Sequence, residues 1–218
     1  MSNGKVKFTL ALLALAAFSG SAQAGFVWID VAAPTATVAN VPTNNDFRAQ
    51  LGTAAVSQMW LGRALGVSGA DAGDFISVDL FAAEAGYRNQ FWANGTSLID
   101  NQGNLGWVAR PEGNFAASNG AVDFRFCAVT IGACLGNAGN DAVLPGSFQS
   151  VGMWLTNPDT AWLLWDDSGA NVDDDYDDLI VRLTYHGNRQ VPEPGTLALF
   201  GMALLGIAMV RRRKVAQI

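Results

Sequence analysis

The feature that most constrains this chain is a regular alternation of apolar and polar side chains in several short runs. In the run 75–80, Ile76, Val78 and Leu80 alternate with polar residues, and the run 122–126 has its apolar residues at every second position. In the run 179–185 one face carries the apolar set Leu179, Val181, Leu183 and Tyr185. Alternation of this kind, with β-branched and aromatic residues, is typical of half-buried strands. No convincing helical period extends over eleven residues in this region, so the pattern predicts an all-β fold.

Clusters of Gly, Asn, Asp and Ser separate these runs. They lie at 44–46, 68–71, 94–96, 101–104 and 137–141. Such residues accept left-handed backbone or bond their own main chain, so they mark turns. Asn94-Gly95 predicts a two-residue hairpin, although Asn94-Gly95-Thr96 also fits a glycosylation acceptor. Many short strands with regular turns predict a single jelly-roll-like β-sandwich over 25–187. The segment 56–66 fits a helix or a strand, and we favour a strand.

Residues 1–24 have the three parts of a secretory signal peptide. Lys5 and Lys7 precede an apolar stretch over 8–18, and Ala22-Gln23-Ala24 forms a cleavage site. The alternative is an N-terminal membrane anchor, but so short a stretch does not span a bilayer. The segment therefore predicts export, with cleavage after Ala24.

The C-terminal end has the composition of a membrane-directed segment. Residues 188–195 are predicted to form a linker that contains Pro192, Glu193 and Pro194, and residues 196–210 carry no charge. Four basic residues follow at 211–214. As a helix, the apolar run would reach ~22 Å, which is short of the ~30 Å hydrocarbon core. We expect 196–218 to form an apolar helix with a basic tail, crossing the inner membrane through 196–210 with the basic residues on the cytoplasmic side.

The order of these parts is specific. Pro-Glu-Pro, a Gly-containing apolar helix and a basic cluster over 191–214 resemble the PEP-CTERM sorting signal. The resemblance implies a substrate of an exosortase, a membrane transpeptidase-like enzyme that processes the signal near its Pro-Glu-Pro. It also implies a Gram-negative bacterium that makes biofilm or exopolysaccharide, with the processed protein at the cell surface or in the extracellular matrix. A plain single-span anchor is the alternative, and the four residues after the basic cluster are more than the signal usually has.

The charge of the region 25–190 argues against a nucleic-acid partner. It contains seven basic residues, all Arg, against eighteen acidic ones, an excess of eleven negative charges. Nucleic acids require a basic face on their partners. Cys127 and Cys134 are the only cysteines. In an exported chain they predict a disulfide, since two cysteines fall short of the four ligands of a structural zinc site.

Eight of the eighteen acidic residues lie between 159 and 178. A hairpin joining the runs 162–165 and 179–185 would bring the carboxylates at both strand ends within a few ångströms. Two like charges 4 Å apart repel by ~4 kcal/mol at an effective dielectric near 20, so the folded loop requires a counter-cation or raised pKa values. Oxygen ligands in a flexible loop suit Ca²⁺. The alternative is a solvated acidic loop. An EF-hand frame starting at Asp173 does not fit, and the single RTX-like nonapeptide at 136–143 cannot stack into a calcium roll.

The acidic segment is also similar to a known domain. Paired acids at a strand end, a Gly-containing loop, and Asp-x-Asp-Tyr-Asp-Asp-Leu before a final strand resemble the DUF4114-type domain, an exported bacterial β-domain regarded as calcium-binding. The similarity covers about 160–187. That family prefers Glu and Asn where this chain has Asp166 and Asp177. Together with the charge argument, it implies Ca²⁺ ligated by Asp167, Asp173, Asp175 and Asp178, with Asp166 and Asp177 as second choices.

Three functions compete. The favoured one is a non-enzymatic envelope or matrix protein stiffened by Ca²⁺. Seven Trp and twelve Phe allow a second, a carbohydrate-binding module that recognises exopolysaccharide, although most Trp are expected in the core. An exposed, aligned row of Trp would reverse that preference. The third is a glycosidase using two Asp. We expect no enzyme, because no catalytic motif accompanies the acids and the single histidine, His186, is predicted to lie on the surface.

Overall fold

The computed structural model describes residues 23–29, 38–52, 59–61, 63–137, 149–167 and 175–187. In this part of the chain nearly all regular structure is β-strand, and the only helix is the four-residue α1 (Arg48–Leu51). Every pair of neighbouring strands is antiparallel. The all-β class expected from the alternating runs is confirmed.

The strands form three sheets. The largest has the order β2-β3-β12-β13-β14-β5-β8. Its strands are β2 (Val38–Ala39), β3 (Met59–Trp60), β12 (Ser150–Asn157), β13 (Thr160–Asp166), β14 (Leu179–His186), β5 (Phe75–Ala83) and β8 (Gly106–Ala116). A four-stranded sheet has the order β11-β10-β6-β7. Its strands are β11 (Ala133–Gly136), β10 (Phe124–Ala128), β6 (Asn89–Ala93) and β7 (Thr96–Asp100). The third sheet, β1-β4-β9, contains β1 (Gly25–Trp28), β4 (Leu65–Ser68) and β9 (Gly120–Ala121).

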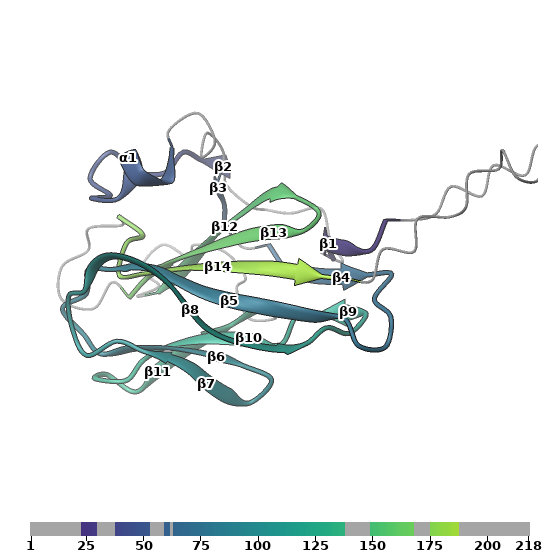
Figure 1. Cartoon of the computed structure of the whole chain (residues 1–218). Coiled ribbons are helices and arrows are strands. Elements are labelled where there is room, and N and C mark those ends of the chain that lie inside the picture. Colours follow the sequence, from purple (N-terminus) through teal and green to yellow (C-terminus); the bar gives the residue numbers. More distant parts are fainter. Residues whose placement is uncertain are drawn as a thin grey trace, which may run out of the picture.

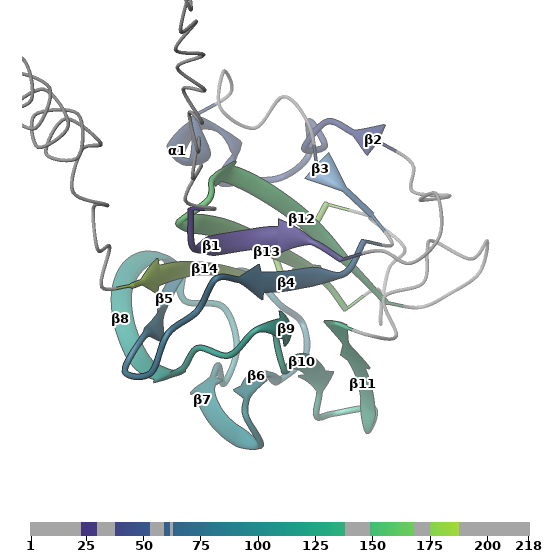
Figure 2. The same cartoon turned by 90° about the vertical axis from the view of Figure 1, so that its right-hand side faces the viewer.

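The two larger sheets lie as layers, one above the other, and α1 lies beyond the seven-stranded sheet (Figure 1). The three-stranded sheet crosses one end of these layers, with β1 and β4 in front in Figure 2. This layering is what a sandwich requires. The jelly-roll-like strand order stays a prediction.

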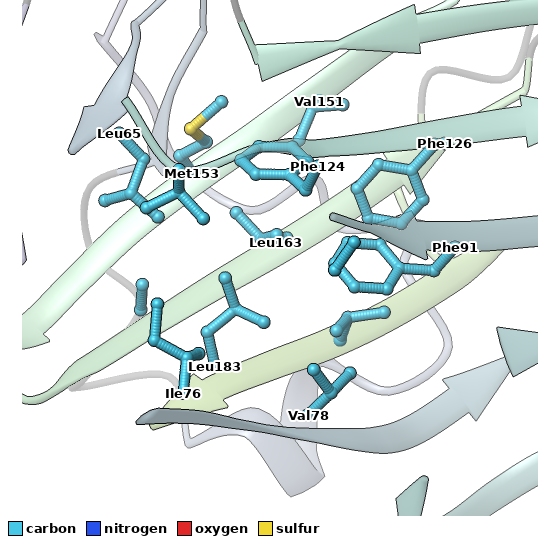
Figure 3. Close-up of a cluster of buried hydrophobic side chains, with 14 of the residues drawn as sticks. Leu65, Ile76, Val78, Phe91, Phe124, Phe126, Val151, Met153, Leu163 and Leu183 are labelled. Carbon is cyan, nitrogen blue, oxygen red and sulfur yellow. The ribbon is translucent and has the colours of Figure 1, made fainter. Parts of the chain in front are cut away.

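The main core fills the space between the sheets. Val78, Leu163 and Leu183 of the seven-stranded sheet meet Phe91 and Phe126 of the four-stranded sheet, and all are buried (Figure 3). Burial of each such side chain contributes about 1.5–3 kcal/mol. Val78, Phe126 and Leu183 belong to the residues that the period-two pattern marks as buried.

A second core covers part of the outer face of the seven-stranded sheet, which we define as the face turned away from the four-stranded sheet. There Leu164 and Ile180 pack with Phe47 and Leu51 of the segment that contains α1. The acidic ends of β13 and β14 are therefore buried on both faces. A strand buried on both faces has a nearly continuous apolar sequence, which explains the uninterrupted apolar residues at 162–165.

The structure agrees with several local predictions. β5 and β14 contain the runs 75–80 and 179–185, and Asn94-Gly95 joins β6 to β7 with φ angles of 45° and 75°. Positive φ at both residues is the type I′ hairpin geometry. The run 122–126 is corrected in one respect: β10 begins at Phe124, because the Val122 N–H bonds the Leu65 carbonyl at 3.0 Å instead.

The ambiguous segment 56–66 contains strand at 59–60 and at 65–66, where the structure describes it. Residues 1–22 of the predicted signal peptide, the linker at 188–195 and the predicted helix at 196–218 lie outside the described residues. Within the described ranges no helix has the length and apolar character needed to cross a membrane.

Candidate functional site

The acidic residues gather at the end of the β13–β14 hairpin where the connecting loop leaves β13 and enters β14. Trp165 pairs with Leu179 in the antiparallel ladder, so Asp166 and Asp167 leave β13 beside the point where Asp177 and Asp178 enter β14. The Asp167 N–H donates to Asp178 Oδ2 at 2.6 Å. These four side chains are only 0%, 4%, 2% and 8% exposed, in the order Asp166, Asp167, Asp177 and Asp178. An exposed acidic loop does not describe them.

The remaining predicted ligands are placed less completely. Asp175 is half-buried, and its Oδ1 accepts a long hydrogen bond of 3.5 Å from the Asp177 N–H. Asp173 lies outside the described residues. Among the residues that are described, no three His, Cys, Asp or Glu side chains are grouped so that they could hold a metal ion. The six-residue ligand set therefore stays a prediction.

Two neighbours of the cluster come from a turn far away in sequence. The Asn45 Nδ2 donates to the main-chain carbonyls of Asp175 at 2.9 Å and Tyr176 at 3.3 Å. The Asp46 N–H donates to Asp177 Oδ2 at 2.8 Å. Tyr176 has a left-handed φ of 62°, and its hydroxyl accepts a hydrogen bond from Ser150 Oγ at 2.8 Å. The segment before β14 is thus fixed by side chains and not only by the ladder.

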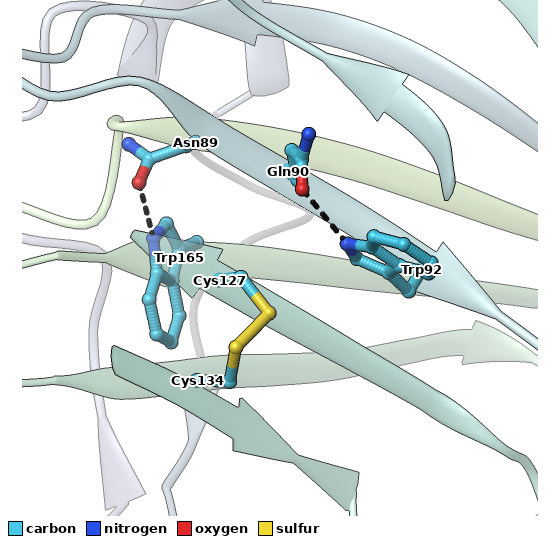
Figure 4. The surroundings of a disulfide bond; sticks show 6 residues. All are labelled: Asn89, Gln90, Trp92, Cys127, Cys134 and Trp165. Atoms are coloured by element: carbon cyan, nitrogen blue, oxygen red, sulfur yellow. Dashed lines mark hydrogen bonds between the residues drawn. A yellow bond between two sulfur atoms is a disulfide. The ribbon is translucent and has the colours of Figure 1, made fainter. Parts of the chain in front are cut away.

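Asn89, the first residue of β6, connects the cluster to the four-stranded sheet. Its Nδ2 donates to Asp167 Oδ2 at 2.6 Å, and its Oδ1 accepts from Trp165 Nε1 at 3.3 Å. Figure 4 shows the second of these bonds, with Trp165 beside the disulfide. The Trp165 ring also stacks on Phe126 at 5.1 Å between centroids. The acidic end of the hairpin is therefore attached to both layers.

Burial changes the acidity of two of these groups. The pKa of Asp178 is raised to about 9. Burial is the largest cause, the charges of Asp167, Asp166 and Asp175 act in the same direction, and the hydrogen bond from the Asp167 N–H opposes them. Burial likewise raises the pKa of Asp177 to about 8, with Asp175 and Glu84 adding to the effect and the Asp46 N–H opposing it. Without a nearby cation both carboxyl groups hold a proton at pH 7. A cation bound there would displace these protons.

Sequence reasoning marked the acids but missed Asn45, Asp46 and Asn89. Asn45 and Asp46 belong to the cluster 44–46, whose composition predicts a turn and nothing more, and no pattern in the sequence marks Asn89. Their partners lie 78 to 131 residues away along the chain. A single sequence does not contain that pairing.

Cys127 and Cys134 form a disulfide in the four-stranded sheet. The two residues stand directly opposite each other in the β10–β11 ladder (Figure 4). The bond therefore ties β11, an edge strand, to the strand beside it.

The chain carries a sorting signal of known type. Residues 190–214 match the PEP-CTERM protein-sorting motif. This stretch contains Pro192, Glu193 and Pro194, the uncharged run 196–210 and the basic cluster, so the resemblance seen in the sequence is confirmed. The protein is accordingly an exported one, transiently anchored in the membrane and of the class processed by exosortases. No curated protein and no solved structure matches the chain. The similarity of 160–187 to the DUF4114-type domain stays a prediction.

Proposed function

We propose that this chain is a non-enzymatic cell-envelope or extracellular-matrix protein, sorted by its PEP-CTERM signal and stabilised by Ca²⁺ at the acidic end of the β13–β14 hairpin. The observation that supports the calcium site is the burial of Asp166, Asp167, Asp177 and Asp178 at one end of one sheet. Burying carboxylates disfavours their charged form unless a cation or donors compensate. Donors that are all hard oxygens suit Ca²⁺ better than softer metals.

The proposed ligands are those that the sequence suggested. Asp167, Asp175 and Asp178 would bind through carboxylate oxygens together with Asp173, and Asp166 and Asp177 are second choices. When Ca²⁺ binds it supplies the positive charge that lets Asp177 and Asp178 ionise. Asn45 and Asp46 hold the backbone of this segment through hydrogen bonds of 2.8–3.3 Å, which limits the ordering cost of binding.

His186 lies far from the acidic cluster. It ends β14, whereas the carboxylates precede that strand. Eight strand residues at ~3.3 Å each separate them by about 26 Å. His186 instead stacks on Phe75 at 4.5 Å and hydrogen-bonds Ser77 at 2.9 Å. It is therefore in no position to serve as the base for the buried carboxylates.

The calcium proposal is tested by thermal unfolding of the full chain in a mild detergent, with Ca²⁺ and with a chelator. Saturation at a hundredfold excess over the dissociation constant stabilises by about 2.7 kcal/mol, so chelation should lower Tm. The double variant Asp175→Asn/Asp178→Asn should lose that sensitivity, and Asp123→Asn, which changes an exposed carboxylate elsewhere, should retain it. Identical melting curves with and without chelator would count against a bound metal ion. An equal rise of Tm with Mg²⁺ would count against Ca²⁺ as the specific ion.

A second candidate is a carbohydrate-binding module, and one observation favours it. Of the seven Trp side chains only Trp165 is fully buried, and the other six are half-buried. Trp107, Trp154 and Trp162 lie with Phe81 at the outer face of the seven-stranded sheet. These side chains pack against the second core and keep part of their surface exposed, which is the feature that a carbohydrate-binding module requires.

A further inference from the structure

We infer that the outer face of the seven-stranded sheet is a binding surface for a neutral, hydroxyl-rich polysaccharide. This inference rests on the carbohydrate-binding candidate and specifies its site and ligand. It is independent of the calcium proposal, because the acidic cluster supplies none of the groups that it uses.

Aromatic side chains cross this face from strand to strand. Trp154 of β12 and Trp162 of β13 are register partners, and their rings are nearly parallel with centroids 6.1 Å apart. The ring centroid of Phe81 of β5 lies 4.6 Å from that of Trp162, and the ring centroid of Trp107 of β8 lies 5.2 Å from that of Phe81. All four are half-buried and lie along the border of the second core. The row extends over five strands, which at ~4.8 Å per strand spacing is about 19 Å, room for several sugar units of one extended chain.

An ion pair lies within this row. Arg182 of β14 bonds Asp79 of β5, with Nη2 2.8 Å from Oδ2. Its guanidinium lies 4.6 Å from the Phe81 ring centroid and 5.8 Å from that of Trp162. The pair places hydrogen-bond donors and acceptors beside apolar ring faces, and a sugar presents the matching combination of hydroxyl groups and apolar C–H faces.

Polar side chains continue the same face beyond the row. Thr184 of β14 is paired in register with Ser77 of β5 and with Thr160 of β13. All three are half-buried, and their strand neighbours Ile76, Ala161 and Leu183 point into the opposite, main core. The outer face therefore changes from aromatic to hydroxyl-bearing side chains along the strands. A purely apolar partner would leave the hydroxyl groups of this strip against an apolar surface, which is unfavourable.

Charge selects a neutral ligand over an anionic one. The region 25–190 has an excess of eleven negative charges, and Arg182, the cation of this face, is already paired with Asp79. Long-range repulsion would oppose an acidic polymer. A neutral glycan carries no such penalty, and stacking and hydrogen bonding are sufficient to hold it.

The test is retention of the full chain, in a detergent without a sugar headgroup, on the insoluble neutral polysaccharides cellulose and chitin and on an alginate gel as the anionic probe. We expect retention on at least one neutral polymer and none on alginate. Trp154→Ala should weaken retention about tenfold, the loss of one aromatic contact, and Thr184→Val should weaken it while leaving Tm unchanged. Trp92→Ala is the matched control, because Trp92 is half-buried as Trp154 is but belongs to the four-stranded sheet, where its ring centroid lies 4.7 Å from the Arg125 guanidinium.

Each outcome separates the possibilities. No retention by wild type on either neutral polymer overturns the inference together with the carbohydrate-binding candidate and leaves the calcium proposal intact. Retention that is unchanged in both Trp154→Ala and Thr184→Val overturns this site alone. Preference for alginate overturns the neutral ligand. Sedimentation velocity of the same samples adds one more criterion, since a self-association that Trp154→Ala abolishes would make the face an interface between copies of the chain.

Discussion

Replacement of Asp178 by Asn tests the electrostatic description of the acidic cluster directly. Asparagine has nearly the same shape and its Oδ1 can still accept the hydrogen bond from the Asp167 N–H, which is 2.6 Å long in the wild type. The substitution removes the charge and leaves the contact. With Ca²⁺ chelated, we therefore expect Asp178→Asn to be more stable than wild type at neutral and alkaline pH.

The size of this effect follows from the raised pKa. Asp178 has a pKa of about 9 in the folded protein, against an ordinary aspartate value of 3.8. The folded state therefore holds a proton that the unfolded chain releases, and stability is fully present below about pH 4 and is lost as pH rises towards about 9. Each pH unit costs about 1.4 kcal/mol, so the loss at pH 7 is about 4 kcal/mol. That is a large part of the 5–15 kcal/mol typical of a folded domain.

The assay is urea unfolding at pH 5, 7 and 8.5 in chelator. Wild type should lose stability steadily from pH 5 upward, and the slope should be smaller in Asp178→Asn, because Asp178 then no longer contributes while Asp177, whose pKa is about 8, still does. Asp123→Asn should follow wild type. A wild-type stability that stays constant or rises from pH 5 to 8.5, or an Asp178→Asn protein that unfolds more readily than wild type at pH 8.5, would refute the argument.

Two further predictions concern the scaffold. Replacing Cys127 and Cys134 together with Ser should lower the free energy of unfolding by about 2 kcal/mol, because the short loop that the bond closes gains entropy in the unfolded chain. Reductant should destabilise wild type and leave the double variant unchanged. Equal urea midpoints for wild type and the double variant would contradict a stabilising bond. Gly25→Ala should cost roughly 1–3 kcal/mol, since the added Cβ would lie 2.4 Å from the Pro158 carbonyl oxygen. Gly86→Ala, whose added Cβ would meet nothing within 4 Å, is the control, and similar melting temperatures for the two variants would show that Gly25 of β1 does not pack against Pro158.

The sequence predicted best those parts of the fold whose partners are close along the chain. The Asn94-Gly95 hairpin needs only two residues with positive φ between two strands. The β13–β14 hairpin was predictable because two apolar runs flank one loop, and its register puts Trp165 opposite Leu179. In each case the residues that set the hairpin lie close together along the chain, so the local pattern is sufficient to predict it.

The parts that the sequence did not predict depend on which face of a strand is covered, and by what. The alternation in β14 marks Leu183 as buried, but it does not reveal that Ile180 on the other face is buried below α1 while Arg182 lies among aromatic rings. The same limit applies to the carboxylates. Asp177 is next to a strand in any hairpin, and only the distant turn containing Asp46 makes it a buried group.

β14 combines these features in one strand of the seven-stranded sheet. It begins at the acidic cluster, presents Arg182 to the aromatic row, and ends at His186, just before the sorting signal that starts at residue 190. β14 has β13 on one side and β5 on the other, so ladders of hydrogen bonds hold it along both edges. A force applied through the C-terminal segment would act along these ladders and would have to shear both of them together. A strand in the interior of a sheet is therefore a mechanically sound attachment point for a protein held at its C-terminal end, and the same strand spaces the acidic cluster about 26 Å from that end.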